Sequence, residues 1–126
     1  MKIAITLSKL PVNDFTYMGI SSEHVYQIHA HDAEINPSWL VAVGIAYLND
    51  MADKENSSYL EWVEVFDAFR GKKLLRLIME KLTEECGTLY FEADEDLVKK
   101  YKAIGAVDYG KNEVTEQTQF YYGLTA

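Results

Sequence analysis

The spacing of apolar residues predicts a run of short strands followed by alternating helices and strands. Apolar and β-branched residues at 3–7 and an alternating pattern at 25–29 favour two opening strands. A nearly continuous apolar run at 39–48 predicts a third strand that is buried on both faces. Residues 59–66 follow as a fourth strand, expected to pair antiparallel with the third. Strict alternation in this strand places Leu60, Trp62, Glu64 and Phe66 on one face and Glu61, Val63 and Val65 on the other.

The second half of the chain begins with a change to helical periodicity. Leu74, Ile78 and Leu82 recur every four residues, and Gly87 supplies a C-terminal stop. The remaining predicted elements are a strand at 88–93, a helix at 94–104 that Gly105 ends, and strands at 107–109 and 117–124. The segment 11–23 has room for one brief helix, with Asn13 or Asp14 as its cap. This order predicts a mixed α+β fold.

Composition limits the class of protein. With 126 residues, of which 48% are hydrophobic and 25% charged, we expect residues 1–126 to form one globular domain. We find neither a signal peptide nor an apolar run long enough for a membrane span. The single cysteine, Cys86, which we expect to be buried in a helix, allows no internal disulfide and favours a cytoplasmic protein.

The net charge of −8 disfavours nonspecific nucleic-acid binding, which needs cationic side chains to neutralise phosphates. A charged partner should therefore be cationic, although the same acidity also serves solubility alone.

Positive charge is nevertheless concentrated at the start of the first predicted helix. Five cations lie within one stretch of twelve residues, namely Arg70, Lys72, Lys73, Arg76 and Lys81. Free N–H groups and the helix dipole favour an anion at a helix N-terminus, so this start is a candidate phosphate site. Charge and position alone fit a solvated helix face equally well.

The letters around these cations resemble the cofactor motif of the GNAT acetyltransferases, in which a strand and a bend precede R/Q-x-x-G-x-G/A at the start of a long helix. The matching segment is 63–78, and Arg70 occupies the Arg/Gln position. Lys73 and Leu75 stand where the family has its two small residues. By this resemblance, the cofactor-binding candidates are Val63, Val65, Arg70, Gly71, Lys72, Lys73, Leu74 and Leu75.

A second segment, 97–106, resembles the family's A-x-x-x-Y-x-x-x-G-F pattern. Tyr101 matches the tyrosine and Gly105 the glycine, whereas Leu97 and Ala106 replace the terminal residues. The resemblance implies that Tyr101 is the general acid for the departing thiolate; the alternative is an aromatic residue that only packs. Glu95 replaces the asparagine that often contacts the pantetheine arm.

The resemblance implies a mostly antiparallel central sheet of about six to seven strands flanked by helices, with a shortened N-terminal helical region. It further implies an N-acetyltransferase that uses acetyl-CoA, in which a primary amine attacks the thioester directly. Backbone groups of Val63 and Val65 would bind the donor, and Glu61 or Glu64 would act as general base. The acceptor would be a small-molecule or peptide amine, cationic by the charge argument, and its site open or completed in a homodimer. A degenerate GNAT-fold protein that binds CoA or a partner without turnover is the alternative.

The three histidines, His24, His29 and His31, predict no metal site, because no cysteine or carboxylate stands near them at ligand spacing. We expect surface imidazoles. No Ser or Cys nucleophile with a base and an orienting group is visible either, which favours direct transfer.

Overall fold

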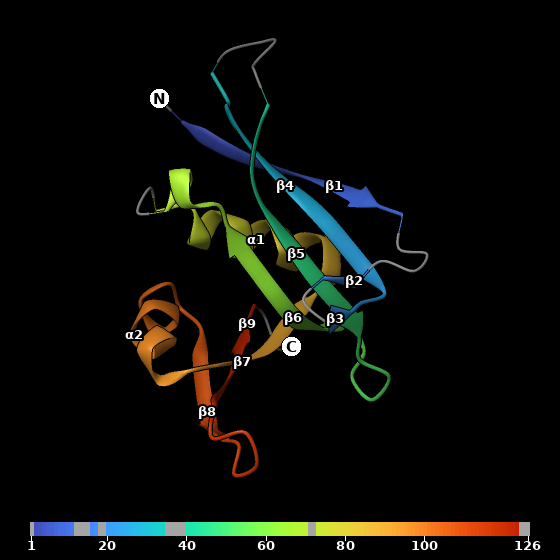
Figure 1. Cartoon of the computed structure of the whole chain (residues 1–126), viewed down its shortest axis with the longest axis vertical. Coiled ribbons are helices and arrows are strands. Elements are labelled where there is room, and N and C mark those ends of the chain that lie inside the picture. The colour runs from blue at the N-terminus through green and yellow to red at the C-terminus, as the bar shows by residue number, and fades with distance from the viewer. Residues whose placement is uncertain (1, 12–15, 18–19, 35–39, 71–72, 124–126) are drawn as a thin grey trace.

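The computed structural model describes residues 2–11, 16–17, 20–34, 40–70 and 73–123. A mixed sheet forms its centre, with strand order β1-β4-β5-β6-β7-β9-β8 (Figure 1). Its strands are β1 (Ile3–Leu10), β4 (His24–Asp32), β5 (Val41–Asp50), β6 (Ser57–Val65), β7 (Thr88–Ala93), β8 (Val107–Lys111) and β9 (Thr118–Tyr122). The helices are α1 (Leu75–Cys86), α2 (Glu95–Ala103) and the short 3-10 turn η1 (Asp67–Phe69). Every pairing in this sheet is antiparallel except that of β6 with β7. The predicted α+β class is confirmed.

Helix α1 packs across one face of the sheet and forms the core with it (Figure 1). Ile78, Met79 and Leu82 of α1 have no exposed surface, as the predicted helical period requires. They meet buried sheet residues such as Leu89 and Phe120. Helix α1 ends at Cys86, and its C-cap, Gly87, has a φ of 80° that glycine adopts at little cost.

The brief helix predicted within 11–23 is wrong for the described part of that segment. Thr16–Tyr17 (β2) and Ile20–Ser21 (β3) pair as antiparallel strands. Threonine, tyrosine and isoleucine favour extended backbone, and this preference prevails over the length argument. The proposed caps, Asn13 and Asp14, lie outside the described residues.

The strict alternation predicted for β6 is also wrong, because the strand contains a β-bulge. Tyr47 pairs with Trp62 and Leu48 with Leu60, so Glu61 has no partner in the β5–β6 register. A bulge of one extra residue exchanges the faces of all residues beyond it. Leu60 is therefore buried in the core, and Val63 and Val65 pack on the same core instead of facing away from it. Trp62 and Phe66 are each 37% exposed.

Replacing Gly87 with alanine should destabilise the fold by about 2 to 4 kcal/mol, the sum of a positive-φ penalty and a steric clash. A Cβ there would clash with the carbonyl oxygen of Asn56. Gly110→Ala is the matched control, because Gly110 also has a positive φ but no atom within 4 Å of the added Cβ. Urea unfolding of both variants measures the difference. Equal losses would contradict the steric part of the argument.

Candidate active site

The sheet opens between its two parallel strands. Strands β6 and β7 pair only from Ser57 opposite Thr88 to Tyr59 opposite Tyr90. In Figure 1 their ribbons meet at one end and then diverge toward α2. The pairing ends two residues before the bulge at Glu61, which bends and twists its strand. A cavity of about 530 Å³ lies in the opening and is lined by β6, β7, α2 and the start of α1.

Six of the ten predicted site residues line this cavity: Glu61, Val63, Val65, Arg70, Leu75 and Tyr101. Lys73 and Leu74 are not among its lining residues, and the side chain of Leu74 is buried in the core. Gly71 and Lys72 lie outside the described residues.

The backbone of β6 turns polar groups toward the opening. The N–H of Phe66 donates to the carbonyl of Val43 over 2.8 Å, which identifies these two residues as a hydrogen-bonded pair. Such pairs alternate along an antiparallel ladder, so Trp62 and Glu64 bond toward β5. The N–H and C=O groups of Val63 and Val65 therefore face the opposite side, toward β7.

The side chain of Arg70 hydrogen-bonds to one of these backbone groups and stabilises the turn after β6. Its Nε donates to the carbonyl of Val65 over 2.8 Å, and its Nη1 lies 2.9 Å from Oδ1 of Asp67. Both members of the ion pair are exposed, so the pair adds little to stability. The guanidinium remains next to the cavity and the start of α1.

The start of α1 is open to an anion. Leu74 is its N-cap, no side chain caps it, and its first turn holds no acidic residue. The first-turn N–H groups have no partner within the helix, and the helix dipole adds positive potential. Lys73 precedes the cap with a φ of 59°, a backbone conformation that favours glycine. Lys73 stands at the first small-residue position of the motif. It therefore has the positive-φ backbone conformation that glycine adopts more readily.

Tyr101 reaches the cavity from α2. Its half-buried ring packs on Phe91 and Phe120, with centroid distances of 4.7 and 5.9 Å. Burial raises the pKa of its phenol above the ordinary value of 10.0, so the hydroxyl keeps its proton and remains a donor. The ring therefore packs in the core and lines the cavity as well, so the packing alternative and the general-acid hypothesis both remain open.

Three glutamates line the cavity, one more than the sequence singled out. Glu61 is exposed and accepts a hydrogen bond of 3.1 Å from Nδ2 of Asn49, while Glu64 is half-buried. The additional one is Glu92 on β7, which accepts from the hydroxyls of Tyr59 at 3.2 Å and Thr115 at 2.6 Å. A charged residue inside the apolar strand 88–93 was the signal for it.

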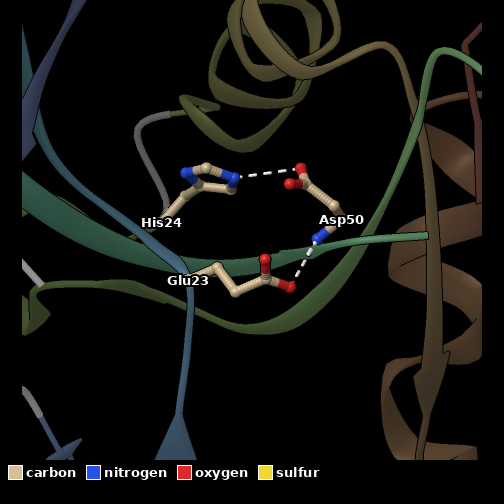
Figure 2. Close-up of side chains that lie close together, drawn as sticks. All are labelled: Glu23, His24 and Asp50. Carbon is tan, nitrogen blue, oxygen red and sulfur yellow. Dashed lines mark hydrogen bonds and ion pairs between the residues drawn. The ribbon is translucent and has the colours of Figure 1, made fainter. Parts of the chain in front are cut away.

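The histidines lie away from this opening. The fold brings Asp50, 26 residues along the chain, to 2.9 Å from Nε2 of His24, a proximity that sequence spacing did not predict (Figure 2). Glu23 accepts from the backbone N–H of Asp50, and ligand atoms of the three side chains lie within 4.8 Å of one another. His24 and Asp50 also line a broad open depression of about 1230 Å³ beside the end of α1. Half-buried Cys86, the last residue of α1, lines it as well.

Comparison with solved structures gives the fold its name. Mutant forms of the spermidine/spermine N-acetyltransferase SpeG from Vibrio cholerae match with a TM-score of 0.57 at 16% identity, over 94% of this chain and 93% of theirs. A domain from Methanocaldococcus jannaschii matches with a TM-score of 0.63 at 10% identity, over 98% of this chain and 100% of its own. A GNAT-family acetyltransferase from Listeria monocytogenes gives 0.55 at 18% identity, over 79% of this chain and 64% of its own.

The chain has the fold of the GNAT acetyltransferases, as the resemblance in its sequence implied. Its seven-stranded, mostly antiparallel sheet and two flanking α-helices agree with that fold. No protein-family model matches the chain, and no curated protein matches it in sequence. Among the described residues, no helix has the length and apolar character needed to cross a membrane.

Replacing Lys73 with glycine should stabilise the fold by about 1 kcal/mol relative to Lys73→Ala, because only glycine relieves the positive φ. The alanine variant removes the same charge and serves as the control. Thermal unfolding of the two variants measures the difference. Equal melting temperatures would show that residue 73 does not hold this conformation.

Proposed function

We propose that this protein is an N-acetyltransferase that moves an acetyl group from acetyl-CoA to a primary amine. The observation that carries the proposal is the early end of the β6–β7 ladder, at Tyr59 opposite Tyr90. The resulting cavity lies between the part of β6 that does not pair with β7 and the start of α1. An extended amide chain with an anionic head matches both: it can add to β6 like a strand, and its phosphates can meet the helix start.

The residues present fit this cofactor. Val63 and Val65 would hold the pantetheine arm through backbone groups, and the N–H groups from Leu75 onward would bind the pyrophosphate. Arg70 and Lys73 would add positive charge to the phosphate site. Gly71 and Lys72, which belong to the same motif, are further cofactor-binding candidates. Leu75 lines the cavity where the family motif has a small residue, and we expect its larger side chain to narrow the space for the pyrophosphate.

Acetyl-CoA supplies an activated thioester, and this chain's residues manage the protons. Tyr101 would donate its phenolic proton to the departing thiolate, for which its raised pKa and its place in the cavity suit it. The attacking amine must lose a proton to a carboxylate or through water, and Glu61, Glu64 and Glu92 line the same cavity. Tyr101 and Glu61 are the predicted pair, with Glu64 and Glu92 as further candidate bases.

A cationic acceptor, either a small molecule or a peptide amine, suits the carboxylates around the opening. Asp94 adds a fourth to the three glutamates. The SpeG structures bear the name of a spermidine/spermine N-acetyltransferase, and spermidine and spermine are cationic amines of this kind.

The single cysteine favours a cytoplasmic protein. The exposed edge strand β8 is a candidate contact surface for a homodimer.

Acetyl-CoA should raise the melting temperature, because a ligand that binds only the folded state stabilises it by about 2.7 kcal/mol at 100 times its Kd. Lys73→Ala should weaken binding more at low salt than at high salt, because screening removes the contribution of an exposed charge. A thermal shift series with acetyl-CoA measures both. No shift at millimolar ligand would refute the cofactor assignment.

Tyr101→Phe should lower kcat by roughly tenfold to a thousandfold and leave acetyl-CoA affinity within a few fold, as expected for a group that acts in the transition state. The phenol donates only while protonated, so its contribution should persist to above pH 10.0 and decline as pH rises through its raised pKa. Thiol release against pH measures this. An equal loss of affinity and rate would make Tyr101 a packing residue, and binding without turnover on any amine would favour the degenerate alternative.

A further inference from the structure

Tyrosines line up across the sheet on the face opposite α1. Tyr59 on β6 pairs with Tyr90 on β7, and Tyr90 pairs with Tyr121 on β9. Their neighbours Leu89, Phe91 and Phe120 are buried in the core, so by strand alternation the tyrosines point the other way.

Tyr109 of β8 completes a cluster that we call the tyrosine triangle: Tyr90, Tyr109 and Tyr121. Its ring centroids lie 6.0 to 6.2 Å apart. Tyr109 is 48% exposed and the other two are half-buried, so part of each side chain is accessible from solvent.

The triangle already holds a cation. The Nζ of Lys54, an exposed residue of the β5–β6 connection, lies 5.2 Å from the centroid of the Tyr90 ring, within cation–π range. Aromatic faces that attract a lysine ammonium also suit the ammonium group of a ligand.

A carboxylate links this surface to the cavity. Glu92 is two residues beyond Tyr90 on the same face of β7, and the hydroxyl of Tyr59 donates to it. Tyr59 and Glu92 both line the cavity. Burial, and to a lesser extent the negative charge of Glu92, raises the pKa of both Tyr59 and Tyr109, so the phenols around the carboxylate stay neutral. Glu92 is thus the charged residue of β7 that follows Tyr90 on this face and also lines the cavity.

We propose that the tyrosine triangle and Glu92 bind the non-reacting ammonium group of an acceptor that carries at least two amines. The acceptor class is then an alkyl diamine or a longer polyamine, with one amine in the cavity and another against the rings. This inference rests on the proposed acetyl transfer for the role of the second amine. Charge complementarity selects the occupant: aromatic faces and a carboxylate attract a dication more strongly than a monoamine and repel an anion.

Calorimetric titration without acetyl-CoA tests the site directly, with 1,4-diaminobutane and 1-aminobutane as probes. The diamine should bind at least tenfold more tightly. Tyr90→Leu should weaken diamine binding roughly three- to tenfold with little effect on the monoamine, because it removes the ring face. Tyr90→Phe is the matched control and should retain most of the affinity, and Lys54→Met should increase it by removing the competing ammonium. Tyr109→Leu, at the most exposed ring, gives the same test if Tyr90→Leu does not fold.

Equal binding of the two amines, or unchanged diamine affinity in both leucine variants, would overturn the proposal. Sedimentation of the wild type and of Tyr109→Leu tests whether a second copy of this chain occupies the triangle instead. A dimer that is lost in the variant would assign the triangle to that second copy and overturn the ligand site. These titrations contain no acetyl-CoA, so a negative result would not affect the assignment of acetyl-CoA as donor, which the thermal shift series tests. The two proposals can therefore fail separately.

Discussion

The bulge at Glu61 is the constraint on which the site depends. One extra residue in β6 leaves the ladder to β5 intact on both sides, yet it increases the local twist, and the pairing with β7 ends just before it. Beyond that point, in the part of the chain that the structure describes, no strand pairs with Val63 and Val65 on the β7 side, and Arg70 bonds to one of these backbone groups. Backbone N–H and C=O groups need partners, so a bound extended chain or water must supply the rest.

The core makes this opening rigid. Helix α1 fixes its own start because Leu74, Ile78 and Leu82 are buried against the sheet, so the helix cannot slide along its axis without losing core contacts. Phe91 and Phe120, which belong to the same core, also hold the ring of Tyr101. Three sides of the cavity therefore belong to packed elements rather than to free loops, as a site that must orient two reactants requires.

Periodicity predicted the helices and strands in which local preference and burial follow the same period. It failed where strand pairing in the folded chain decides which face a residue occupies. Strand 88–93 and the helix that ends at Gly87 match β7 and α1, since their apolar residues follow the period of each element. The bulge left no trace in the letters of 59–66, because Val63 and Val65 are apolar on whichever face they lie. Glu92 and the tyrosine triangle come together through strand pairing, which joins residues that are far apart in sequence. The motif did locate the cavity, since Arg70 and Tyr101 both line it.

The charge distribution gives the opening two unlike sides. Arg70, Lys73 and Arg76 lie at or near the start of α1, which packs on one face of the sheet, whereas Glu92 and the tyrosines lie on the other face. An anionic donor and a cationic acceptor would thus be attracted toward the same gap from opposite faces, each repelled from the other's approach. The net charge of −8 therefore does not describe the charges around the opening, where groups of both signs lie close together. If the protein transfers acetyl groups as proposed, the carboxylates that line the cavity would attract the acceptor amine, while Arg70 and Lys73 beside the start of α1 would attract the phosphates of the donor.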